Sequence, residues 1–214
     1  MNKKTGLACA LAAAIVALSG CTPAIYTIGG TIPSTNPSKG ATKAQFSLSG
    51  DTCDGVEENG TFTYHDKSAT AWNPKQKGVG LQMTGPVIFV SDCSNPTEEG
   101  EAEFCAGDWG GDLNPEVQYL LDNCPLRGQA SGVPVKYFGA IYVSTNARYP
   151  GEGIVFGCAQ DNGQGGKVDY KDWATIIVPS SEFDGPNGPY AGYRNTGSVQ
   201  GNVATFACPE LPPT

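Results

Sequence analysis

The chain has 214 residues, of which 39% are hydrophobic and 16% are charged, enough apolar sequence for one domain with a core of its own. Its 13 basic residues are outnumbered by 21 acidic residues, so the net charge is −8. A surface of this sign repels phosphate groups, which excludes nucleic acid and an electrostatic attraction to anionic lipid. The 29 glycines and 16 prolines favour turns over long helices.

The first 21 residues have the pattern of a secretory signal. Lys3 and Lys4 provide the positive start, and residues 7–18 form an apolar run. A run of about twelve residues is too short for a permanent membrane span, which needs about 20. We therefore predict that residues 1–21 form a signal peptide that is removed. Removal takes away two of the 13 basic residues and no acidic one, so 11 face 21 and the mature net charge is −10.

The end of this signal, Leu18-Ser19-Gly20-Cys21, resembles the lipobox of bacterial lipoproteins. The resemblance implies cleavage before Cys21, acyl chains on that cysteine, and an anchor in the bacterial cell envelope. Two or more acyl chains hold a protein stably at a membrane, whereas one does so only marginally. Thr22 stands where Asp would signal retention in the inner membrane, so the resemblance favours the outer membrane of a host with two.

The segment after the anchor is rich in Thr, Ser, Pro and Gly, a composition typical of linkers. We predict a flexible tether over residues 22–44, a β-domain over residues 45–208, and a C-terminal tail over residues 209–214. As a coil, the tether would hold the domain roughly 25–30 Å from the membrane.

From Gln45 onward, apolar and polar residues alternate in short segments bounded by Gly, Pro, Asn and Asp. This pattern predicts about eight short strands and an all-β fold, either a small barrel or a sandwich. The segments are 45–49, 60–66, 79–83, 87–90, 133–143, 154–158, 168–178 and 199–208.

Residues 91–126 interrupt the strand pattern with nine carboxylates and no Lys or Arg. Within them, Asn114-Pro115-Glu116 is a good helix start, because Asn caps, Pro suits the first position, and an acid favours the positive helix end. Val117, Leu120 and Leu121 then fall on one helical face. We predict an acidic insertion that is pinned by disulfides and carries one short helix.

Eight cysteines are present, of which Cys9 leaves with the signal and Cys21 carries lipid. An even remainder in an exported chain predicts up to three disulfides, with fifteen pairings open. No Cys-x-x-Cys pair supports a metal site instead. The disulfide candidates are Cys53, Cys93, Cys105, Cys124, Cys158 and Cys208.

Three motifs resemble those of a small, uncharacterised bacterial secreted β-domain. They are Gly60-Thr-Phe-Thr-Tyr-His-Asp66, the hairpin Asp161-Asn-Gly…Asp169, and a final Gly197-Ser-Val-Gln-Gly-Asn202, where the family commonly has Gly for Gln200. The resemblance implies a compact barrel-like fold that accompanies other extracellular modules, and it implies no established catalytic activity.

Candidate chemistry is sparse along the chain. His65 is the single histidine and no Gly-x-Ser-x-Gly elbow is present, so a serine hydrolase triad is not supported and we predict a non-enzyme. Calcium is the one cofactor that the sequence suggests, because Asp161, Asn162, Asp169 and Asp172 offer hard oxygen ligands. The alternative is a turn in which these carboxylates accept hydrogen bonds from backbone amides.

The acidic insertion also contains the sequence Asp108-Trp109-Gly-Gly-Asp112, which joins an aromatic ring to two carboxylates. We predict that Asp108, Trp109 and Asp112 form the contact region of a non-catalytic module that binds an envelope protein or a glycan. One alternative is a glycan hydrolase that uses carboxylates of the insertion. The other is a structural envelope component without a discrete ligand.

Overall fold

The computed structural model describes residues 24–38, 41–51, 53, 59–67, 69, 80–91, 115–124, 135–160, 172–180 and 188–208. These residues form nine strands and one helix, which confirms the all-β prediction. The elements are β1 (Ala24–Ser38), β2 (Ala41–Asp51), β3 (Asn59–Asp66), β4 (Leu81–Ser91), α3 (Pro115–Asn123), β5 (Val135–Ser144), β6 (Glu152–Gln160), β7 (Trp173–Ile177), β8 (Arg194–Ser198) and β9 (Gln200–Ala207).

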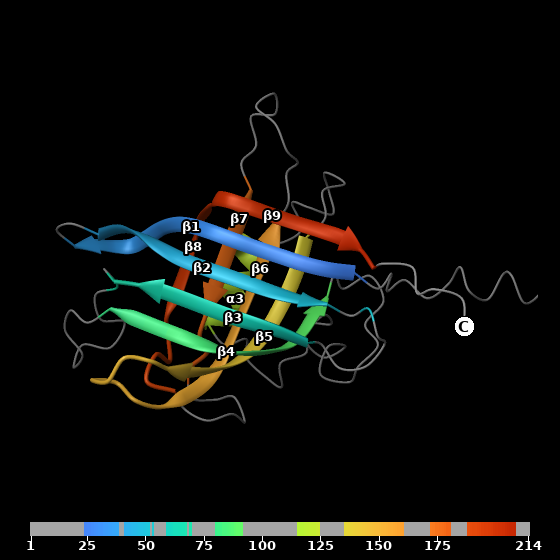
Figure 1. The fold of residues 1–214 in the computed structure, drawn as a ribbon. Coiled ribbons are helices and arrows are strands. Elements are labelled where there is room, and N and C mark those ends of the chain that lie inside the picture. The colour runs from blue at the N-terminus through green and yellow to red at the C-terminus, as the bar shows by residue number, and fades with distance from the viewer. Residues whose placement is uncertain are drawn as a thin grey trace, which may run out of the picture.

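The strands make one antiparallel sheet in the order β8-β7-β6-β5-β4-β3-β2-β1-β9. Although β8 and β9 lie at opposite ends of this order, only Val199 separates them in the chain, so the sheet must curl around on itself. Figure 1 shows β9 and β1 to β4 running across β5 to β8. Asn195 of β8 donates a hydrogen bond to the carbonyl oxygen of Pro33 in β1 at 3.0 Å. The result is a nearly closed barrel.

Alternation along each strand fills the barrel interior. Phe46, Leu48, Phe62 and Tyr64 point inward and are almost fully buried, while the residues between them face outward. Because successive side chains of a strand point to opposite faces, this is the pattern that the alternating sequence predicts. The inward residues form one continuous apolar core.

Helix α3 covers the outer face of β6 to β8. Val117 and Leu120 are fully buried and pack with Ile177 in a second apolar cluster outside the barrel. Carboxylate oxygen Oε2 of Glu116 accepts hydrogen bonds from the backbone N–H and the hydroxyl of Ser180, at 3.2 and 2.9 Å, which fixes the start of the helix. The predicted short helix is therefore confirmed, with its start at Pro115.

Two disulfides join described residues, Cys53 to Cys208 and Cys124 to Cys158. The second ties the end of α3 to β6, as predicted for a disulfide-pinned helix. Cys93 and Cys105 lie outside the described residues. No helix in the described part of the chain is both long and apolar enough to cross a membrane.

The prediction of a flexible tether over residues 22–44 is wrong for residues 24–38 and 41–44, which lie in strands. Residues 24–38 form β1, which pairs with β2 on one side and with β9 on the other. Gly30 has a φ of 155°, and a Cβ there would lie 2.6 Å from the carbonyl oxygen of Gln200. The small residues of this segment thus let two strands approach closely, a use of glycine that composition alone does not distinguish from a linker.

Candidate functional site

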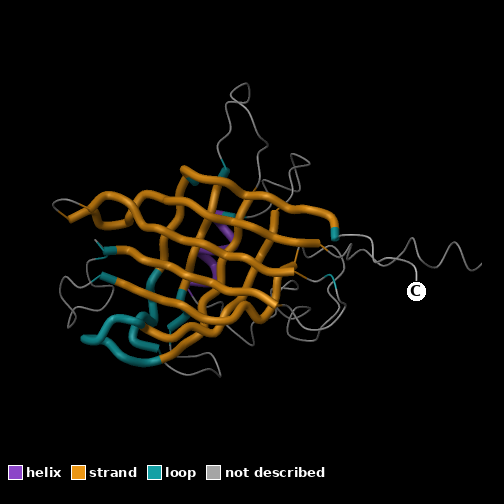
Figure 2. The backbone as a smooth tube through the Cα atoms, viewed as in Figure 1, coloured by secondary structure: helices purple, strands orange, loops and turns teal. Residues whose placement is uncertain are grey.

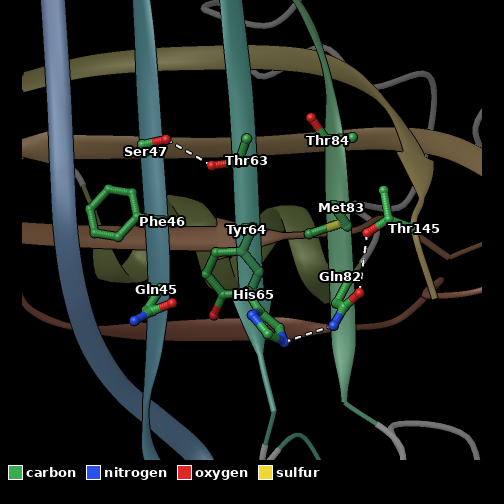
Figure 3. Close-up of a pocket in the computed structure, with 10 residues that line it drawn as sticks. All are labelled: Gln45, Phe46, Ser47, Thr63, Tyr64, His65, Gln82, Met83, Thr84 and Thr145. Atoms are coloured by element: carbon green, nitrogen blue, oxygen red, sulfur yellow. Dashed lines mark hydrogen bonds between the residues drawn. The ribbon is translucent and has the colours of Figure 1, made fainter.

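A shallow groove of about 400 Å³ lies on the outer face of β2, β3 and β4 (Figure 3). It is the main candidate for a binding site among the described residues. Its lining residues are Gln45, Phe46, Ser47, Thr63, Tyr64, His65, Gln82, Met83, Thr84 and Thr145.

Strand alternation and register together create the groove's polar surface. Phe46, Tyr64 and Met83 are buried in the core, so the residues beside them face outward. Antiparallel pairing aligns these outward residues in two rows across the three strands. One row consists of Ser47, Thr63 and Thr84, and the other consists of Gln45, His65 and Gln82.

Hydrogen bonds between neighbouring strands hold these side chains in place. The hydroxyls of Ser47 and Thr63 are 2.7 Å apart, and Nε2 of His65 lies 2.9 Å from the amide nitrogen of Gln82. The hydroxyl of Thr145 donates to the amide oxygen of Gln82 at 3.2 Å. Figure 3 shows Gln82 between His65 and Thr145. The groove is therefore a preordered array of hydroxyl and amide groups.

His65 takes part in this array as a neutral hydrogen-bond acceptor. Partial burial, and next the positive charge of Lys67, lower the pKa of His65 below its ordinary value of 6.5, although Asp66 opposes the shift. The imidazole is therefore neutral at pH 7, and its Nε2 accepts a hydrogen bond from the amide of Gln82. At neutral pH the groove presents no charge from this residue.

The groove offers recognition chemistry and lacks a catalytic pair among its described lining residues. None of those residues carries a carboxylate, and the one other ionisable group besides His65 is Tyr64. Burial raises the pKa of Tyr64, and its hydroxyl bonds to Tyr193 and Asn195 inside the barrel. The outward-facing polar groups of the groove are therefore hydroxyls, amides and the imidazole of His65.

A buried polar cluster lies inside the barrel beneath this face. Asp66 is fully buried, and its Oδ2 accepts hydrogen bonds from the hydroxyls of Ser34 and Tyr193, both at 2.9 Å. The hydroxyls of Tyr64 and Tyr193 are 2.7 Å apart, and Asn195 donates to Tyr64 at 2.9 Å. Burial raises the pKa of Tyr193 well above its ordinary value. The cluster links β1, β3 and β8 where the barrel closes.

Neither this cluster nor the groove was predicted from the sequence. His65 entered the sequence-based prediction as the single histidine and Asp66 as the end of a motif, with no face of the strand assigned to either residue. The usable signal was the alternation Tyr64-His65-Asp66, which puts Asp66 on the same inward face as Tyr64 and puts His65 outside.

Most residues predicted for binding or calcium lie outside the described part. This applies to Cys21, Asp108, Trp109 and Asp112, and also to Asp161, Asn162 and Asp169. Asp172 is described, and its carbonyl oxygen accepts a hydrogen bond from the backbone N–H of Val199 at 2.7 Å. Within the described residues, no group of three or more His, Cys, Asp or Glu side chains is placed to hold a metal ion. Calcium binding stays a prediction.

No protein-family model, curated protein or solved structure matches this chain. The motifs that resemble a secreted β-domain fall on β3 and at the junction of β8 with β9, and that resemblance stays a prediction. A functional proposal therefore depends on the groove's chemistry and on the N-terminal signal.

Proposed function

We propose that the protein is a lipid-anchored lipoprotein of the bacterial cell envelope whose barrel binds a neutral glycan without converting it. The ligand lies in the groove on the outer face of β2, β3 and β4. The observation that carries the proposal is the pair of hydroxyl and amide rows that line this groove.

Neutral glycans suit these rows because each sugar hydroxyl both donates and accepts hydrogen bonds. Thr and Ser hydroxyls do the same, and the Gln amides offer a donor and an acceptor on one side chain. The mature chain carries a net charge of −10, yet none of the groove's described lining residues is acidic. The site is therefore matched to an uncharged polar ligand.

The hydrolase alternative requires two carboxylates on either side of a glycosidic bond, about 5–9.5 Å apart. The described lining of the groove supplies none. Hydrolysis through Asp108 and Asp112 is a separate prediction, and the experiment below distinguishes it from binding.

The test is a neutral-glycan panel with the mature chain made soluble by Cys21→Ser. For any glycan retained, the double variant Thr63→Val/Gln82→Leu should weaken affinity about tenfold or more, since each lost hydrogen bond contributes about 0.5–1.5 kcal/mol. The control is Thr27→Val, which removes an exposed hydroxyl of β1 outside the groove. Titration calorimetry measures both changes.

Three results would contradict the proposal. The first is retention of no glycan by the wild-type domain. The second is equal affinity for the groove variant and the wild type. The third is release of shorter sugars that is lost in Asp108→Asn or Asp112→Asn, which would make the protein a hydrolase.

A further inference from the structure

The chain between the proposed lipid anchor and the barrel is very short. Thr22 and Pro23 alone separate Cys21 from Ala24, the first residue of β1. Three residue steps span at most about 11 Å when fully extended. If Cys21 is acylated, as the proposed function requires, the start of β1 is confined to the headgroup region or its immediate vicinity.

An exposed aromatic side chain lies at this end of the barrel. Ile25 in β1 is the direct partner of Phe206 in β9. Tyr26 is buried inside, so alternation directs Ile25 outward. Phe206 exposes 54% of its surface, and Ile25 is half-buried beside it. Next to a bilayer such a ring can leave water, because apolar side chains that include Phe are stabilised at the boundary between headgroups and acyl chains.

A disulfide holds this apolar edge in position. Cys208, two residues after Phe206, is bonded to Cys53, which follows the end of β2. In the sheet, Asp51 at the end of β2 pairs with Ile25. The ends of β1, β2 and β9 are thus joined at the anchored end of the barrel, and Phe206 cannot move far from the anchor.

We propose that Ile25 and Phe206 form a membrane-contacting edge, with the ring of Phe206 inserted into the interface of the bilayer that holds Cys21. The contact is apolar rather than electrostatic, because a mature chain with a net charge of −10 is repelled by anionic lipid. Phosphatidylcholine, which is zwitterionic and has no net charge, therefore suffices as the lipid, and the contact should persist at high salt.

This orientation also places the glycan groove away from the membrane. The groove row of Gln45 and His65 lies six residues along β2 from Asp51, the partner of Ile25. At about 3.3 Å per residue, that separation is about 20 Å along the strand. The groove would open toward the space beyond the headgroups, where an envelope glycan can reach it.

The experiment uses the full acylated lipoprotein in phosphatidylcholine vesicles that contain lipids brominated on their acyl chains, which quench tryptophan on contact. Phe206→Trp is compared with Val143→Trp, a matched control because Val143 exposes 50% of its surface and lies beside the groove, opposite Thr84. Both sites are exposed, so both variants should fold. For Phe206→Trp we expect tryptophan emission beyond that of the wild type, shifted to the blue and quenched by the brominated lipid. For Val143→Trp we expect added emission that the brominated lipid does not quench.

Flotation of the same vesicles tests the anchor separately, with Cys21→Ser as the unanchored control. Flotation without extra quenching of Phe206→Trp relative to Val143→Trp overturns the membrane-contacting edge and leaves the anchor standing. Failure of the wild type to float overturns both the anchoring and the edge. Quenching that disappears at high salt overturns the apolar character of the contact.

Discussion

The barrel has two outer faces that differ in polarity: the outward residues of one are apolar and covered by α3, and those of the other are polar and exposed. On β6 and β7, Phe156, Cys158 and Ile177 face outward and lie beneath α3. On β2 and β3, the outward residues include Ser47 and Thr63, which are exposed. Helix α3 packs against β7 and β8, and Figure 2 shows it among the crossed strands in projection. The same strand geometry therefore supports a covered apolar face and an open polar face, and the outward residues decide which.

Two hydroxyl pairs make this comparison quantitative. Thr175 and Thr196 are cross-strand partners on the covered face, and Ser47 and Thr63 are partners on the open face. In each pair the hydroxyl oxygens are 2.7 Å apart. Thr175 is fully buried, whereas Ser47 and Thr63 are exposed to water. Identical contacts should therefore contribute differently to stability.

The largest expected effect comes from the disulfide that fastens the cover. Cys124→Ala/Cys158→Ala removes a cross-link between residues 34 positions apart. Loss of this constraint on the unfolded chain should lower the free energy of unfolding by about 3–4 kcal/mol. Urea denaturation of the soluble domain measures it. An unchanged midpoint would mean that α3 stays docked through packing alone.

Truncation of the packed helix face should come next. Leu120→Ala empties a fully buried position between α3 and the barrel, and we expect a loss of about 3 kcal/mol. The matched variant Ile141→Ala truncates an outward residue of β5 that is 40% exposed, and its cost should stay under about 1 kcal/mol. Equal losses in urea denaturation would contradict the distinction between a covered and an open face.

The hydroxyl pairs provide a smaller and more direct test. The Thr196 hydroxyl bonds to the hydroxyl of Thr175 and accepts a hydrogen bond from the indole N–H of Trp173 at 2.9 Å. Thr196→Val removes this shared partner from both groups. We expect a cost of about 1–3 kcal/mol, because unpaired buried polar groups lose their hydration. Thr63→Val should cost no more than about 0.5 kcal/mol, because water replaces the lost hydroxyl. Chemical denaturation of both variants checks the contrast.

The smallest effect is the pH dependence of the open face. The pKa of His65 is lowered in the folded protein, so the unfolded chain binds more protons between that pKa and the ordinary value of 6.5. The contribution of neutral His65 to the free energy of unfolding is therefore fully present above about pH 6.5. It declines as the pH falls from 6.5 through the lower pKa of the folded protein. His65→Gln should remove this decline. The difference in urea midpoint between wild type and variant should therefore be constant above about pH 6.5 and should change below it. Parallel pH profiles for the two proteins would contradict it.

The strands of the open face could be predicted from sequence, whereas the groove could not. Phe46 and Leu48 alternate with polar residues, and Phe62 and Tyr64 do the same, so the facing of each strand follows from its period of two. The groove depends on which strands become neighbours and in what register, since Ser47 meets Thr63 only after β2 pairs with β3. The two residues are 16 positions apart, and the alternation within a single strand specifies neither its neighbour nor its register.

The first strand was missed for a related reason. Residues 24–38 contain Tyr26, Ile28 and Ile32 at inward positions, but the glycines and prolines around them have the composition of a linker. Gly30 is needed there because the backbone of β9, about 170 residues later, approaches too closely for a side chain. A close approach of this kind leaves no local signal.

The sequence by itself determined that this is an all-β chain with a short helix after Asn114, and its local patterns also predict the signal and the lipidated cysteine. Alternation, helix capping and signal motifs are short-range properties that a few neighbouring residues specify. Tertiary structure alone decided which outer face α3 covers, which cysteines pair, and that Asp66 is buried among Ser34 and Tyr193. Those outcomes depend on the curling of one nine-stranded sheet, which brings β8 beside β1 through contacts that no local pattern encodes.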